Sequence, residues 1–126
     1  MELDFLDNIN EYGESVVRLY NFNKGEAIKF RDIIQSTIIQ NKSKLDLSTV
    51  DFIVRRNCNL ILGLFTADEG ILRQDNETFI CILTLESYQN MLKLIEPFCL
   101  KDTKAHQYLY DVDVPTDFLF APAGSW

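Results

Sequence analysis

Three aspartates near the end of the chain form the densest group of chemically active side chains in the sequence. Asp111, Asp113 and Asp117 occur within seven residues, in the segment DVDVPTD. Side chains alternate along an extended strand, so Asp111 and Asp113 are expected on one side of it, with Asp117 approaching across a turn. Carboxylates gathered in this way are ligands that Ca²⁺ or Mg²⁺ prefers. A metal site is therefore one interpretation of this segment.

The pattern of the segment favours other roles for these aspartates. It lacks the glycine and the closing glutamate of an EF-hand calcium loop, and Pro115 stands in its middle. With Val112 and Val114 facing a core, the aspartates would face solvent in an ordinary charged turn, and we predict no metal ligand. Contact with a partner protein is the third interpretation, and it extends to the turn TADEG, which presents two further carboxylates. The candidate partner-binding residues are Asp68, Glu69, Asp111, Asp113 and Asp117.

Other side chains that enzymes use are sparse. His106 is the single histidine, and the sequence contains none of the motifs GxGxxG, GxxxxGK[ST], HExxH and GxSxG. A histidine at the start of a strand is more often a surface residue than a general base, which also requires a nucleophile in reach. Two carboxylates acting across a cleft stay open as an alternative, because their separation in space does not follow from sequence spacing. We predict no catalytic residue and no cofactor, and the balance favours a protein that is not an enzyme.

The cysteines and the N-terminal residues indicate the compartment. Cys58, Cys81 and Cys99 are odd in number and widely spaced, and no secretory leader is seen in MELDFLDNIN. These features favour reduced thiols in the cytoplasm over a disulfide framework. Cys81 lies in the apolar stretch TFICILTL and is expected to be a small core residue. No apolar run approaches the roughly 20 residues that span a membrane.

The charge balance is acidic, with a net charge of -7 and a pI near 4.6. Nonspecific binding to nucleic acid or to an anionic membrane requires a basic surface, so neither is expected. An acidic surface suits a basic protein partner, and it also keeps a small protein in solution. The 126 residues, 47% of them hydrophobic, predict a single globular domain over residues 1–126.

Helical periodicity occurs in three places. The strongest pattern predicts a helix over residues 24–41, with Asn23 as its N-cap and Glu26 completing a capping box. A second helix is expected between Thr84, as its cap, and Pro97, which is expected to end it. The spacing of apolar residues near the N-terminus predicts a further short helix that ends at Gly13.

Segments rich in β-branched and aromatic residues predict the strands. In chain order they are ESVVRLYNF, TVDFIVRR, LILGLFT, ILRQ, TFICILTL, HQYLYDVDV and DFLFA. The residues NCN between the second and third segments are typical of a hairpin turn, and the middle segments are expected to form an antiparallel meander. Trp126 is expected to anchor the end of the last strand. The predicted fold is α+β, with a mainly antiparallel sheet of about five or six strands, two main helices and a short N-terminal helix.

Two of the predicted strands are apolar on both of their faces. Ile61 alternates with leucines in LILGLFT, and Ile80 and Ile82 alternate with Phe79 and Cys81 in TFICILTL. A sheet with one face in water shows a cleaner alternation, so both faces are expected to be covered. The cover is either a helix of the same chain or a second copy of the chain, which makes a homodimer one expectation.

Three functions are consistent with these observations. The first is a small acidic cytoplasmic protein that binds a basic protein, as intracellular inhibitors and immunity proteins do. The second is an enzyme or small-ligand-binding protein with a pocket at a dimer interface or between the sheet and the helices, where Tyr, Arg and carboxylate side chains would converge. The third is a structural subunit of a homo-oligomer. The absence of catalytic motifs and the carboxylates in predicted turns favour the first.

Overall fold

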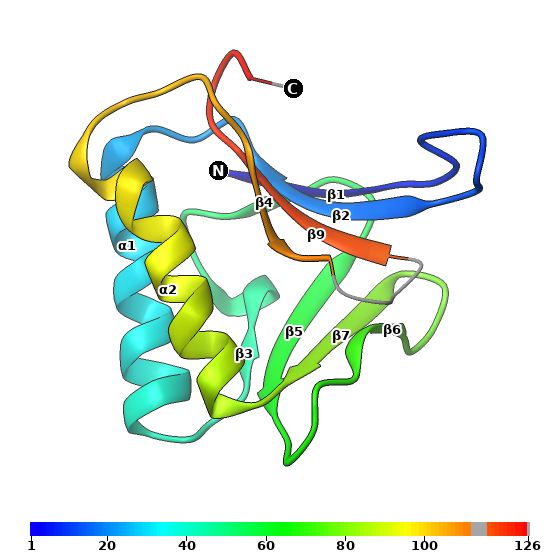
Figure 1. Cartoon of the computed structure of the whole chain (residues 1–126), viewed down its shortest axis with the longest axis horizontal. Coiled ribbons are helices and arrows are strands. Elements are labelled where there is room, and N and C mark those ends of the chain that lie inside the picture. The colour runs from blue at the N-terminus through cyan, green and yellow to red at the C-terminus, as the bar shows by residue number, and fades with distance from the viewer. Residues whose placement is uncertain (112–115, 126) are drawn as a thin grey trace.

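The computed structural model describes residues 1–111 and 116–125, and these form a mixed α+β fold with two sheets (Figure 1). The strands are β1 Glu2–Leu6, β2 Ser15–Tyr20, β3 Leu45–Asp46, β4 Val54–Arg55, β5 Asn59–Leu64, β6 Gly70–Arg73, β7 Thr78–Leu83, β8 Gln107–Tyr110 and β9 Thr116–Ala121. Within the described residues, sheet A has the order β4-β1-β2-β9-β8 and sheet B has the order β3-β5-β7-β6. The α+β class that the sequence predicts is confirmed, with two sheets in place of one.

The first helix follows the prediction closely. It comprises α1, Lys24–Ile34, which continues into the π-helical segment η1, Gln35–Gln40. The predicted capping box is present, because the Asn23 side chain accepts from the Glu26 N–H at 2.9 Å and Glu26 accepts from the Asn23 N–H at 3.2 Å. The helix expected over residues 24–41 is thus confirmed, with a wider winding in its last six residues.

The second helix, α2, runs from Leu85 to Leu100 and begins at the predicted cap, Thr84. The expectation that it ends at Pro97 is wrong, because this proline lies inside the helix. Proline removes one backbone hydrogen bond and crowds the preceding turn. Burial offsets this cost, since the buried Phe98 packs in the last turn with its ring centroid 5.1 Å from that of Phe120.

The predicted N-terminal helix is absent, and β1 takes its place. This strand pairs antiparallel with β2, with Leu3 opposite Leu19. Leu3, Leu6 and Ile9 fit a helical spacing, whereas Leu3 and Phe5 fit the alternation of a strand, so the pattern alone is ambiguous. The strand structure is favoured because β2 provides hydrogen-bond partners for the backbone groups of β1. Gly13, with φ of 73°, lies in the turn before β2 and ends no helix.

The predicted antiparallel meander is also wrong, and both sheets are mixed. The strand β4 belongs to sheet A, where it runs parallel to β1, and the strands β5 and β7 are parallel neighbours in sheet B. The strand β6 lies antiparallel to β7 on its other side. The segment NCN therefore forms no hairpin. The Asn57 side chain instead accepts from the Phe5 N–H at 2.8 Å and donates to the Phe5 carbonyl at 3.0 Å, which ties the segment to β1.

The two sheets and the two helices enclose one main hydrophobic core. Figure 1 shows α1 and α2 side by side, along one side of both sheets. Fully buried members of this core come from every layer, among them Leu19, Phe30, Leu60, Tyr88 and Phe120. A second, smaller cluster lies on the opposite face of sheet A, around the buried side chains of Val16, Leu119 and Ala121.

The outer face of sheet B remains partly uncovered in the described structure. Ile61, Ile80 and Ile82 are partly exposed and belong to neither hydrophobic cluster. Leu72, register partner of Ile80 on β6, is 48% exposed. The residues of β5 and β7 that point inward are buried in the main core, which explains why that face of the two strands is apolar. The described structure does not explain the apolar residues on their outer face. The expected cover by a helix of the same chain is not found there.

Candidate functional site

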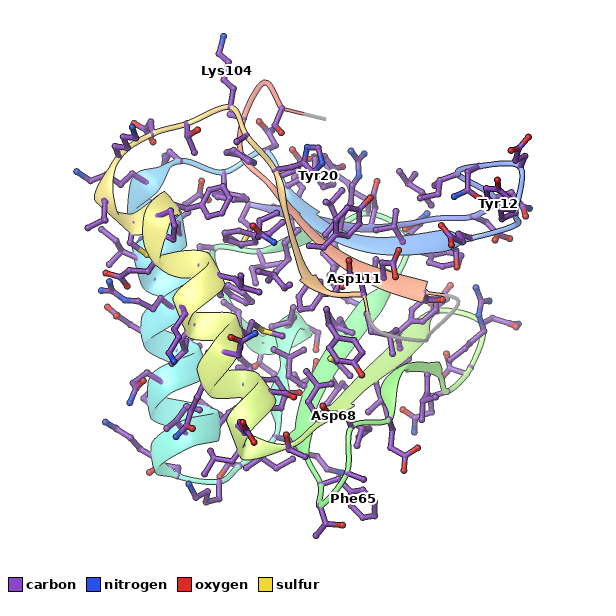
Figure 2. All side chains as sticks on the ribbon, viewed as in Figure 1. Tyr12, Tyr20, Phe65, Asp68, Lys104 and Asp111 are labelled. Carbon is purple, nitrogen blue, oxygen red and sulfur yellow. The ribbon has the colours of Figure 1, made fainter. Side chains whose placement is uncertain are left out.

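The structure brings Asp111 and Asp117 to the same end of sheet A. Asp111 follows β8, and Asp117 is the second residue of β9, which pairs antiparallel with β8. On its other side β9 runs parallel to β2, so that Thr116 lies opposite Ser15. This register carries Glu14, the residue before β2, to the same end of the sheet. Figure 2 labels Asp111 at the lower end of β8, close to this junction.

These carboxylates influence one another electrostatically. Partial burial raises the pKa of the Asp117 carboxyl above its ordinary value, and the negative charges of Glu14 and Asp111 raise it further. The pKa of the Tyr108 hydroxyl, on β8, is raised by burial first and then by the charges of Asp117, Asp111 and Glu14. Each shift reports that a negative charge is disfavoured here. We call Glu14, Asp111 and Asp117 the acidic cluster.

The acidic cluster has no basic counterpart among the described ion pairs. In residues 1–111 and 116–125, the carboxylates that form ion pairs are those of Glu2, Asp4, Glu26, Asp32 and Glu96. Glu14 accepts a hydrogen bond from the neutral side chain of Asn10 at 2.7 Å. The same residues hold no group of three or more His, Cys, Asp or Glu side chains placed to bind a metal ion. Among the ion pairs of the described residues, the cluster thus combines like charges without a neutralising cation.

Asp68 has a defined position at the beginning of α2. Its carboxylate accepts from the Thr84 N–H at 2.7 Å and from the Ser87 hydroxyl at 2.6 Å. Partial burial disfavours its charge, but the hydrogen bonds from Ser87 and Thr84 outweigh that effect and lower the pKa of the carboxyl. A negative charge at a helix N-terminus is also favoured by the helix dipole. Asp68 therefore stabilises α2, a role that the sequence did not indicate.

A groove joins Asp68 to Asp111. It has a volume of about 320 Å³ and is lined by Asp68, by residues of α2 and by the five consecutive residues 107–111. Glu69 is exposed but does not line this groove. Asp113 and Trp126 lie outside the described residues. Of the five candidate residues, Asp111 therefore connects two sites, the acidic cluster with Asp117 and the groove with Asp68.

Sequence reasoning missed two members of this region, Glu14 and Tyr108. Glu14 is 103 positions from Asp117 in the chain, and only the parallel pairing of β2 with β9 brings it near. Tyr108 lies in a predicted strand, and its place near Asp111 and Asp117 depends on the antiparallel pairing of β8 with β9, whereas its place near Glu14 depends on the pairing of β2 with β9. No motif spacing could have found Glu14, because a parallel pair has no hairpin to fix its register.

The three thiols are buried in the described structure, and the histidine lies at the surface. Cys81 is fully buried, as predicted, and burial raises the pKa of its thiol and of the Cys58 thiol to about 12. The pKa of the Cys99 thiol is also raised by burial. A thiol with a raised pKa is a poor nucleophile at neutral pH. His106 is exposed, with its ring centroid 6.0 Å from that of Tyr108.

Comparison with known proteins adds no further residue to the site. The chain matches no protein-family model, no curated protein and no solved structure. In the part of the chain that the structure describes, neither helix is long and apolar enough to cross a bilayer. The acidic cluster and the groove therefore carry the functional argument by their own geometry.

Proposed function

We propose that this chain is a binding protein of the inhibitor or immunity type, which recognises a basic protein through the acidic cluster. The observation that carries the proposal is the strand register, which brings Glu14, Asp111 and the partly buried Asp117 to one end of sheet A. Carboxylates that lie together repel one another and reduce stability, and carboxyl groups perturbed in this way cluster at functional sites. A lysine or arginine of a partner would relieve the repulsion and form charge-assisted hydrogen bonds.

The overall charge supports the same reading. With a net charge of -7, the chain attracts basic proteins over a distance of about one Debye length, roughly 8 Å at physiological salt. Such steering raises the association rate more than it raises the affinity. Binding of this kind is expected to weaken strongly as the salt concentration rises.

The experiment is capture of partners from native lysate at low and at high salt. The test variant is Asp111→Asn combined with Asp117→Asn. The matched control is Asp51→Asn combined with Glu77→Gln, which removes the same two charges from exposed positions away from the cluster. We expect a basic protein to bind the unmodified chain and the control at low salt, and to be lost with the test variant. Equal capture by both variants, or capture that does not depend on salt, would contradict the proposal.

A second candidate function, self-association, is favoured by the outer face of sheet B. Ile61, Ile80 and Ile82 form an aliphatic face together with the exposed Leu72. Gly63 adds no side chain to this face, and a Cβ at that position would lie 3.7 Å from Ile82 and 3.8 Å from Lys44. Flat apolar sheet faces are commonly covered by a second sheet about 10 Å away. A second copy of this chain would supply such a face.

The size of this face limits the strength of the dimer. Four strands about 4.8 Å apart, with the longest six residues at about 3.3 Å each, cover about 400 Å². Stable interfaces bury about 800 Å² on each partner. A weak, concentration-dependent dimer is therefore expected, to be measured by light scattering over a dilution series. Ile80→Lys should keep the chain monomeric, whereas Val54→Lys, at an exposed position on the edge of sheet A, should not.

The enzyme alternative gains less from the geometry. An active site of the expected kind would bring tyrosine, arginine and carboxylate side chains together. The groove between α2 and β8 contains Tyr108, Tyr110 and two aspartates, but its lining includes no arginine. We therefore rank binding above catalysis.

A further inference from the structure

The groove between α2 and β8 follows the edge of a strand. Its lining includes every residue from Gln107 to Asp111. Side chains of a strand alternate between its two faces, so a hollow that touches five consecutive residues runs along the edge of the strand and not over one face. The strand β8 is the terminal strand of sheet A in the described structure, with β9 as its neighbour on the other side.

The opposite wall of the groove is a straight stripe of α2. Ser87, Asn90 and Leu94 are three and four residues apart, which places them on one face of the helix. This stripe is about 10 Å long, and the lined part of β8 is about 13 Å long. Figure 1 shows the chain ascending through α2 and descending through β8, so the two walls run in opposite directions. The groove therefore has the shape of a short channel between a helix and a strand edge.

The two ends of this channel differ in charge. Because the walls run in opposite directions, the start of the α2 wall, with Ser87 and its partner Asp68, lies toward the end of β8 that Asp111 follows, and Leu94 lies two turns further along α2. The acidic cluster adjoins the first end through Asp111. No lysine or arginine is among the residues that line the channel. One end thus favours a cationic side chain, and the other favours an apolar or uncharged one.

One backbone carbonyl of β8 accepts a hydrogen bond from a side chain of the same strand. The carbonyl of Tyr108 accepts a hydrogen bond from the Gln107 side-chain amide at 2.9 Å. An amide donor of a side chain has the same chemistry as the N–H of an added strand, which could replace it. Strand edges are common sites of peptide binding, in which backbone hydrogen bonds provide affinity and side-chain positions provide specificity.

From this geometry we infer that an extended segment of a basic protein binds in the channel as an additional strand on β8. A lysine or arginine of the segment lies at the end that contains Asp68 and Asp111, and an apolar residue lies near Leu94. This inference rests on the proposed function, since it names the form in which the basic partner binds. The charge of the channel selects the partner, and the strand edge fixes its conformation.

The test uses the full chain and fluorescein-labelled hexapeptides of sequence Lys-Val-Lys-Val-Thr-Val, followed by fluorescence anisotropy at low salt. Two further versions of the peptide carry N-methyl groups on alternate amides, on the odd residues in one and on the even residues in the other. In an added strand only one of these sets faces β8. We expect one methylated version to lose at least about tenfold in affinity while the other binds nearly as well as the parent peptide.

Two variants of α2 provide the matched protein test. Asn90→Arg adds a bulky cation to the wall of the channel, whereas Leu100→Arg adds the same charge at an exposed position at the end of α2, which lines neither the channel nor the hollow beside it. Arginine is a good helix former, so both variants should fold. The first should lower the affinity of the hexapeptide about tenfold and the second by much less.

The outcomes separate this inference from the proposed function. If both methylated peptides bind like the parent, or lose affinity equally, strand addition is overturned. A loss on Asp111→Asn with Asp117→Asn would then still support recognition by charge. If no hexapeptide binds at low salt, the inference is also overturned, and capture from lysate decides the proposed function independently.

Discussion

Val16 and Asp117 are register partners in the parallel ladder between β2 and β9. Val16 is fully buried in the small cluster on the outer face of sheet A, and Asp117 is partly buried beside it. The pairing therefore holds a carboxylate at the margin of an apolar cluster, where hydration is incomplete and Glu14 is near. The electrostatic cost of a negative charge on Asp117 therefore follows from the strand register and not from any local motif.

The first prediction concerns the stability of Asp117→Asn. Because the folded-state pKa of this carboxyl is raised, folding is penalised when the group is charged, so the variant should be more stable than the unmodified chain at pH 7. Interactions between partly exposed charges amount to about 0.2–1 kcal/mol, and a gain in that range is expected. The gain should vanish as the pH falls through the folded pKa and below the ordinary value of 3.8, since both states are then protonated. Urea denaturation across this pH range measures it, and a loss of stability at pH 7 would contradict the account.

The second prediction compares two neighbouring carboxylates, Asp68 and Glu69. Asp68→Asn weakens the hydrogen bonds to Thr84 and Ser87 and removes the charge at the start of α2, which should cost about 1 kcal/mol at pH 7. Glu69→Gln, at an exposed position in the same turn, should change the free energy of unfolding by less than about 0.5 kcal/mol. Since the pKa of Asp68 is lowered, its stabilising effect is lost as the pH falls through that folded pKa. Equal effects of the two substitutions at pH 7 would argue against a capping role for Asp68.

The third prediction concerns the ion pair between Asp4 and Arg18. Both guanidinium contacts are short, with Nε to Oδ1 at 2.7 Å and Nη2 to Oδ2 at 3.0 Å, and Arg18 also lies 3.9 Å above the ring of Tyr20. The pKa of Arg18 is raised, chiefly by the hydrogen bond with Asp4. Asp4→Asn would leave a partly buried cation without its carboxylate and should cost about 2 kcal/mol. Asp7→Asn, beyond the end of β1 and exposed, is the control, and thermal denaturation should distinguish the two.

The fourth prediction concerns Tyr88, which links α2 to sheet B. Its hydroxyl is buried and donates to the Cys81 carbonyl at 2.7 Å. Tyr88→Phe removes this donor without changing the packing of the ring, and it should lower the free energy of unfolding by about 1.5 kcal/mol. Tyr12→Phe is the matched control, because Tyr12 is 80% exposed. Chemical denaturation of both variants at pH 7 tests the difference, and a neutral Tyr88→Phe would show that the hydrogen bond adds little.

Local signals predicted the elements whose ends are determined within the chain. The N-caps Asn23 and Thr84 lie where the capping patterns placed them, because an N-cap hydrogen bond joins residues only a few positions apart. The predicted helix near the N-terminus failed for the converse reason. Leu3 and Leu6 suit a helix, Leu3 and Phe5 suit a strand, and the neighbouring strand β2 decides the outcome.

The arrangement of the strands was predicted least well. The segment NCN has the composition of a hairpin turn, yet Asn57 bonds to the backbone of β1 and the strands on either side of it enter different sheets. The parallel pairing of β5 with β7 was likewise unforeseen. Pairing between strands distant in the chain depends on packing of the whole core, which a local pattern does not contain.

The sequence by itself determined the class of the fold, the two main helices with their caps, most of the strand segments and the acidic balance of the chain. These follow from propensity, periodicity and composition, which act within a few residues or over the chain as a whole. Only the tertiary structure decided which carboxylates meet. The parallel ladder of β2 with β9 brings Glu14 to Asp117, and the packing of α2 beside β8 places Asp68 across a groove from Asp111. Electrostatic interactions depend on distance in space, and long-range strand pairing sets that distance.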